Sequence, residues 1–113
     1  MKQRPVYLNY LSAGAQDNSS SIPVEEVIYF RADKANTTVV TNKGEHRVRI
    51  PLHELLAMLD PERFWQVHRS TVVNIDCIET VEREDQDHLV VKLKERDECI
   101  TVANPFCQQF LVQ

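Results

Sequence analysis

The stretch Phe64-Trp65-Gln66-Val67-His68-Arg69-Ser70-Thr71-Val72-Val73-Asn74 decides most of what the sequence says about fold and function. Three of its first four residues are apolar, and Val72-Val73 is typical of a buried strand. Between them, His68-Arg69-Ser70 places an imidazole, a guanidinium and a hydroxyl on consecutive residues. A guanidinium can make bidentate contacts to guanine or to phosphate, and a neighbouring hydroxyl can also bind phosphate. The triplet therefore predicts a nucleic-acid contact, unless Arg69 pairs with a local carboxylate and His68 caps a strand inside the fold.

One amphipathic helix is predicted just before this stretch. Four leucines recur with the spacing i, i+3, i+4, i+7, which forms one apolar face of a helix: Leu52, Leu55, Leu56 and Leu59. Pro51 suits the first turn, and Asp60-Pro61 ends the helix, after which Asp60 can cap a second short turn.

Most of the remaining chain is predicted to form strands. Thr37–Thr41 and Glu45–Ile50 surround a turn at Asn42-Lys43-Gly44 and should form a hairpin, with a polar loop at Asp33–Asn36 before it. Asn104-Pro105 is predicted to open a C-terminal helix. The further predicted strands are Pro5–Leu11, Ile22–Val24, Val27–Phe30, Val72–Ile75, Cys77–Val81, Leu89–Leu93 and Cys99–Val102.

The sequence thus predicts a mainly β domain with one central amphipathic helix and a short C-terminal helix. We divide the chain into an N-terminal strand and loop at residues 1–21, part of or leading into the domain, and the domain proper at residues 22–113. Strands flank the central helix on both sides, so a helix-turn-helix, which needs two adjacent helices, is excluded.

Composition limits the functions that the chain can have. It has 113 residues, a net charge of −4 and three cysteines, of which none forms a Cys-x-x-Cys pair. Its two glycines exclude a phosphate-cradling glycine loop, and its four histidines lack metal-ligand spacing. We therefore predict no metal, no cofactor and no enzymatic activity, and we expect a cytoplasmic protein without a membrane span.

The stretch Phe64–Asn74 resembles the signature of the LytTR domain family, which runs Phe, spacer, His-Arg-Ser, two apolar residues, Asn. The flanks are similar too. Residues 22–30 resemble the family's entry strand, residues 37–44 its central hairpin, and residues 51–61 its helix and the following turn. The resemblance covers about residues 22–111.

The resemblance implies a fold of several small antiparallel sheets that binds promoter DNA. Such domains are output domains of bacterial two-component response regulators, bind double-stranded DNA, usually at tandem direct repeats, and insert loops into successive major grooves. It implies a monomer that pairs on DNA, with a receiver domain in a longer protein. Arg69 would read a base edge, and Lys34, Ser70 and Lys43 would hold phosphates. The implied contact regions also include His68, Asn36, Thr37 and Asn104.

The chain departs from the family after the last strand. Members have a Ser-Arg pair there, whose Arg reaches a base, whereas this chain has Val102-Ala103-Asn104. A bidentate base contact is worth roughly 1–3 kcal/mol of discrimination. Asn104 could pair with adenine instead, or it could simply cap the C-terminal helix. The missing Arg and the acidic segment 82–98 define an alternative function: a LytTR-like fold that serves as a protein-interaction or regulatory module.

Overall fold

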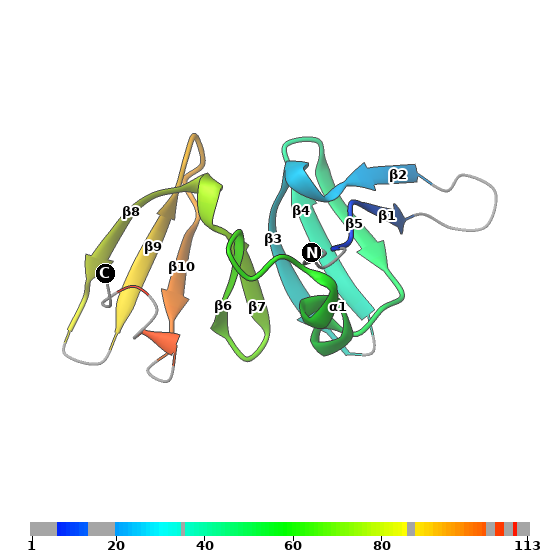
Figure 1. Ribbon diagram of the computed structural model, residues 1–113. Helices are drawn as coiled ribbons and strands as arrows, with labels where there is room; N and C mark the ends of the chain where they lie inside the picture. The colour runs from blue at the N-terminus through cyan, green and yellow to red at the C-terminus, as the bar shows by residue number, and fades with distance from the viewer. Residues whose placement is uncertain are drawn as a thin grey trace, which may run out of the picture.

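The computed structural model describes residues 7–13, 20–34, 36–85, 88–103, 106–107 and 110. Across these residues the chain forms three antiparallel sheets, one α-helix and two short 3-10 turns (Figure 1). The elements in chain order are β1 (Tyr10–Ala13), β2 (Ser20–Pro23), η1 (Val24–Glu26), β3 (Val27–Asp33), β4 (Asn36–Thr41), β5 (Gly44–Val48), α1 (Leu52–Met58), β6 (Phe64–His68), β7 (Thr71–Asn74), η2 (Ile75–Cys77), β8 (Ile78–Arg83), β9 (Leu89–Leu93) and β10 (Cys99–Val102).

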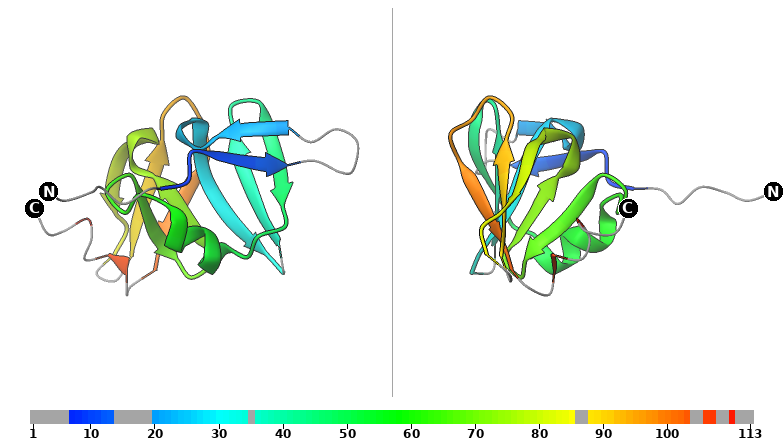
Figure 2. Two further views of the ribbon diagram at one scale, coloured as in Figure 1. Left: turned by 45° about the vertical axis from the view of Figure 1, so that its right-hand side comes forward. Right: turned by 90° about the vertical axis from the view of Figure 1, so that its left-hand side faces the viewer.

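The five-stranded central sheet has the order β5-β4-β3-β7-β6 and is covered on both faces. One face packs against α1 and the β1–β2 hairpin through a core that includes Phe30, Val39 and Val72. Figure 2 shows α1 and this hairpin lying on the same side of the central sheet. The other face packs against the three-stranded sheet β10-β9-β8 through a second core that includes Val67 and Val73. Adjacent residues of β7 thus enter opposite cores, because side chains alternate across a strand.

Helix α1 forms where the leucine spacing predicts it. Leu52, Leu55 and Leu59 are buried in the first core. Asp60 Oδ1 accepts a hydrogen bond from the Glu62 backbone N–H at 2.9 Å, which confirms the predicted capped turn after the helix. This turn delivers the chain into β6.

Asn74, the last residue of the signature stretch, has a structural role. It is 1% exposed; its Nδ2 donates to the Val27 carbonyl at 2.9 Å, and its Oδ1 accepts from the Asp76 backbone N–H at 3.0 Å. A buried amide with both ends bonded ties the start of β3 to the turn after β7. The stretch is therefore in part a packing signature.

The predicted fold class is confirmed, with differences in single elements. Phe64–His68, for which the sequence pattern predicted no strand, is a strand of the central sheet. The N-terminal strand predicted at residues 5–11 begins only at Tyr10, and its Leu11 is buried beside Ile22 in the first core. The predicted C-terminal helix lies largely outside the described residues. The described part of the chain contains no helix long and apolar enough to cross a membrane.

Candidate nucleic-acid interface

Three chain segments that sequence reasoning selected meet at one edge of the molecule. Asp33 pairs with Asn36, so β3 and β4 join through a two-residue turn at this edge. Arg31 of β3 pairs with Thr71 of β7, which brings the β6–β7 turn beside it. The end of β10 joins them, because the Ala103 N–H donates to the Val67 carbonyl at 2.9 Å. Both turns and this strand end lie along the lower edge in Figure 1.

Arg69 is exposed at the tip of the β6–β7 turn. Among the described residues, no carboxylate forms an ion pair with its guanidinium. The alternative in which Arg69 pairs with a local carboxylate therefore has no support in the described part of the chain. A guanidinium on a short turn at the molecular edge can reach a base or a phosphate that approaches it.

The backbone of the same turn is fixed by hydrogen bonds. The Ser70 carbonyl accepts from the Ala32 N–H at 2.8 Å, which anchors the turn to β3. The Ser70 N–H donates to His68 Nδ1 at 3.2 Å, and Ser70 Oγ lies 2.9 Å from the same nitrogen. His68 is exposed and Ser70 is half-buried. The turn therefore presents the Arg69 side chain from a backbone that is already ordered.

Lys34 occupies the β3–β4 turn with φ of 57°, in the left-handed region that tight two-residue hairpin turns require. It is exposed, and no ion-pair partner is found for it among the described residues. Asn36, the first residue of β4, is half-buried at the same edge. Lys34 and Asn36 therefore lie at the same edge as the Arg69 turn.

Thr37 and Lys43 do not join it. Thr37 is 0% exposed, and its hydroxyl donates to the Ile50 carbonyl at 2.6 Å, so its side chain is closed to a DNA partner. Lys43, for which the resemblance implied a phosphate contact, lies away from Lys34 and Arg69. Lys43 lies in the β4–β5 turn, at the opposite end of β4 from Lys34.

The surroundings of Lys43 also argue against a phosphate site. It lines a cavity of about 520 Å³ together with Lys94 and four acidic residues, and a lining with more carboxylates than ammonium groups disfavours a phosphate. The acidic residues of this lining are Glu25, Glu26, Asp76 and Glu95.

The edge contains a cation that sequence reasoning missed. Val48 pairs with Thr37, which brings the next residue, Arg49, beside the start of β4 near the Lys34 turn. Arg49 is exposed and, within the described residues, has no ion-pair partner. Nearby, Arg47 pairs with Asp33 at 3.0 Å on the surface. The alternation of buried Val48 with exposed arginines on either side could have indicated this placement.

The end of β10 contributes less than the family pattern implies. Val102 is buried and Ala103 is half-buried. Asn104 lies outside the described residues. Beyond β10, the acidic tip with Glu84 and Asp85 is at the same edge, because Leu89 pairs with both Val102 and Arg83. The cationic part of the edge is therefore the part formed by the β3–β4 turn, the residue after β5 and the β6–β7 turn, which carry Lys34, Arg49 and Arg69.

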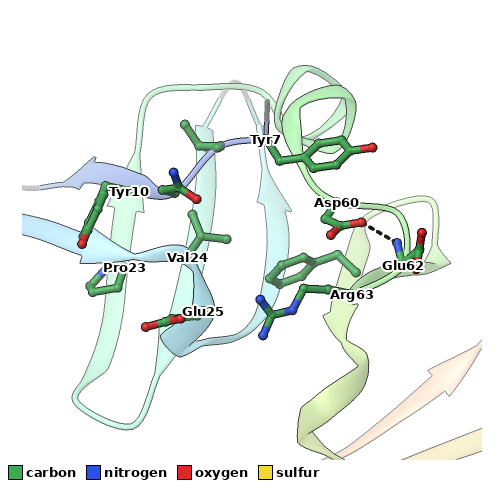
Figure 3. Close-up of a pocket in the computed structure, with 11 residues that line it drawn as sticks. Tyr7, Tyr10, Pro23, Val24, Glu25, Asp60, Glu62 and Arg63 are labelled. Carbon is green, nitrogen blue, oxygen red and sulfur yellow. Dashed lines mark hydrogen bonds between the residues drawn. The ribbon is translucent and has the colours of Figure 1, made fainter. Parts of the chain in front are cut away.

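A larger cleft, of about 840 Å³, lies between the N-terminal segment, the junction of β2 with η1, and the turn that leads from α1 into β6 (Figure 3). Three carboxylates and one guanidinium line it: Glu25, Asp60, Glu62 and Arg63. Arg63 also bridges to Asp76 at 3.3 Å. The mostly acidic lining of this cleft is unsuited to a polyanion such as DNA. The edge that carries Arg69 is therefore the candidate interface.

A small β-rich domain that presents cationic turns of its central sheet along one edge suits DNA recognition through loops. Comparison with known sequences agrees, because the profile of the LytTr DNA-binding domain matches residues 17–111. The chain belongs to the LytTr DNA-binding domain family.

Two relatives are named as bacterial regulators. The chain is 38% identical over 85 residues to an uncharacterized response regulatory protein of Vibrio cholerae, covering 72% of the chain and 33% of the relative. It is 33% identical over 96 residues to the positive alginate biosynthesis regulatory protein of Pseudomonas aeruginosa, covering 84% of the chain and 38% of that protein. The chain thus spans about a third of the length of these relatives.

The fold matches a solved structure of the same domain type. The LytTr DNA-binding domain of a putative methyl-accepting/DNA response regulator from Bacillus cereus superposes with a TM-score of 0.82 at 19% identity. The match covers 91% of this chain and 94% of that one. At this identity the similarity shows the fold alone.

Proposed function

We propose that this chain is the promoter-binding output domain of a cytoplasmic bacterial transcriptional regulator and that it reads duplex DNA with the edge formed by the β3–β4 and β6–β7 turns. The observation that carries the proposal is the Arg69 guanidinium, exposed on an ordered turn and without a carboxylate partner among the described residues. The proposal assigns no catalytic role to the chain.

The contacts divide by chemistry. Arg69 enters the major groove, where a guanidinium can bind guanine O6 and N7 in a bidentate manner. Lys34 in the β3–β4 turn and Arg49 directly after β5 flank it and hold phosphates, which position the domain without reading sequence. Ser70 and Asn36, whose side chains are shorter than those of Lys34 and Arg49, supply further polar contacts to the DNA. Thr37 and Lys43 are left out because the first is buried and the second lies at the far end of the sheet.

The domain acts within a longer regulator. The match covers only 33% and 38% of the two relatives, and one of them is named as a response regulatory protein. We propose that a receiver domain accompanies this domain, and that the isolated domain is a monomer of which two copies occupy tandem direct repeats.

The proposal is tested by in vitro selection of bound duplexes from a random pool, followed by fluorescence anisotropy on the selected duplex and on a scrambled one. We expect an enriched motif, a preference for it over the scrambled duplex, and affinity that falls with rising salt. If two phosphates are neutralised, the log–log slope is about −1.8, since each contributes about −0.9. Folded protein that enriches no motif at about 50 mM salt would contradict the proposal, because low salt strengthens DNA binding.

That negative outcome would favour the second candidate function, a protein-interaction module. The outer strand β8 is exposed over most of its length and carries Glu79 and Glu82, and the tip that follows it is acidic. Ala103 also leaves the β10 end without the arginine that the family pattern has there.

A further inference from the structure

The β6–β7 turn is closed by a side chain whose role is distinct from that of its neighbour Arg69. His68 Nδ1 lies 3.2 Å from the Ser70 backbone nitrogen. A backbone N–H can only donate, so Nδ1 must accept, and the ring proton of the neutral imidazole then resides on Nε2. This fixes the ring orientation that the turn requires.

The contact has the geometry of an Asx turn, in which a side-chain acceptor bonds the backbone N–H two residues later. Within the described residues the same arrangement occurs at the β4–β5 turn, where Thr41 Oγ1 accepts from the Lys43 N–H at 3.1 Å, and at two further turns. Asp60 Oδ1 accepts from the Glu62 N–H at 2.9 Å, and Asn74 Oδ1 accepts from the Asp76 N–H at 3.0 Å. His68 therefore does with Nδ1 what Asp60 and Asn74 do with a carbonyl or carboxylate oxygen.

A β-bulge aligns His68 for this task. The β6–β7 pairing shifts between Gln66 and His68, so that His68 pairs with Thr71 and Val67 is the extra residue. Val67 is 0% exposed, and its carbonyl accepts from the Ala103 N–H. Bulges of this kind re-aim the side chains that follow them. The buried Val67 thus sets where the His68 ring stands over the turn.

We propose that His68 is a positioning residue for DNA reading: its Nδ1 holds the Ser70 N–H and so fixes the turn that presents Arg69, while the ring itself makes no essential DNA contact. This rests on the proposed function of the edge. Three of the four backbone polar groups of residues 69 and 70 have partners, because the Arg69 carbonyl also accepts from Gln66 Nε2 at 3.5 Å and the Ser70 carbonyl accepts from Ala32. Without His68 the Ser70 N–H loses its partner, and the turn can sample other conformations.

The test compares His68→Asn with His68→Ala. Asn retains an acceptor for the N–H two residues later, but its Nδ2 donor lies closer to the backbone than Nε2 of His, whereas Ala lacks both acceptor and donor. We expect His68→Asn to bind the selected duplex within about twofold of the unmodified protein, and His68→Ala to bind about 2- to 10-fold more weakly, the usual range for one lost hydrogen bond. Equal losses in the two variants would overturn the proposal and indicate direct contact by the ring. Matching thermal melts would exclude a general loss of folding.

A second measurement needs no DNA. In the free protein, 15N NMR should show an unprotonated Nδ1 on His68 and slow hydrogen exchange at the Ser70 amide. The slow exchange should persist in His68→Asn and be lost in His68→Ala. A fast-exchanging Ser70 amide in the unmodified protein would refute the positioning role. If instead the NMR results are as expected but no duplex binds, the proposed function fails while the turn assignment stands.

Discussion

The two ends of the central sheet carry similar residues in similar turns, yet only one end suits DNA. At one end, Lys34 and Arg69 stand on the β3–β4 and β6–β7 turns without ion-pair partners among the described residues. At the other end, Lys43 stands on the β4–β5 turn among the carboxylates that line its cavity. A cation in a turn is therefore not sufficient for a phosphate site. The charges of its spatial neighbours decide, and these come from segments distant in sequence.

The largest expected effect comes from removing one cation at each end. Arg69→Ala should weaken binding to the selected duplex by about 5- to 150-fold, the value of one bidentate base contact. Lys43→Ala, which changes the net charge equally, should leave affinity within about twofold. Fluorescence anisotropy at one salt concentration measures both. Comparable losses in the two variants would mean that general charge, and not the Arg69 turn, governs binding.

Thr37→Val sharpens the comparison at the interface end itself, because Thr37 is near the edge but buried. The substitution removes the hydrogen bond to the Ile50 carbonyl and leaves that acceptor without its partner. We expect a loss of about 1–3 kcal/mol in the free energy of unfolding, the cost of a buried polar group without its partner. Urea denaturation measures it. Affinity for DNA, measured where the variant is fully folded, should not change, and a large loss there would return Thr37 to the interface.

Salt dependence separates phosphate contacts from base reading. Lys34→Asn and Arg49→Gln should each reduce the slope of log affinity against log salt by about 0.9, because each removes one neutralised phosphate. Asn is chosen at position 34 because it tolerates the left-handed conformation there. The matched control, Lys43→Gln, should leave the slope unchanged. An unchanged slope in Lys34→Asn or Arg49→Gln would remove that residue from the phosphate contacts.

The smallest effect concerns the pH dependence of stability, to which Tyr29 and Glu98 contribute. Tyr29 donates its hydroxyl to Glu98 Oε2 at 2.6 Å, and burial raises the pKa of Tyr29 from 10.0 to about 12. Its contribution to stability is therefore full below pH 10 and declines as the pH rises towards 12. Hydrogen bonds from Arg96 and then Tyr29 lower the pKa of Glu98 below its ordinary value of 4.5.

Glu98 consequently stabilises the fold at pH values above 4.5, and this contribution is lost as the pH falls through its lowered pKa. Thermal melts of the unmodified protein and of Glu98→Gln between acidic and neutral pH should converge at the acidic end. Curves that stay parallel over the whole range would exclude this role for Glu98.

Local patterns predicted much of the fold. The leucine spacing placed α1, and the turn at residues 42–44 placed the β4–β5 hairpin, because both depend on neighbouring residues alone. Strand β6 was missed because the half-buried Gln66 and the bulge before His68 break the alternation that indicates a strand.

The assembly of the interface depended on long-range pairing that local patterns cannot reveal. The pairing of β3 with β7 is what brings Lys34 beside Arg69. The resemblance implied a DNA contact at Thr37, a polar residue at the end of a loop. Its pairing with Val48 leaves it buried. Cys99 is exposed for a similar long-range reason, because it faces away from the second core on an outer strand.

The most direct test of the central claim is an NMR titration of the 15N-labelled domain with the selected duplex. We expect amide shifts to change at residues 33–34, 36, 49 and 68–71, and those of the β4–β5 turn at residues 42–44 to stay unchanged. Shift changes centred on residues 42–44, with the Arg69 turn unaffected, would contradict this expectation and place DNA at the opposite end of the sheet.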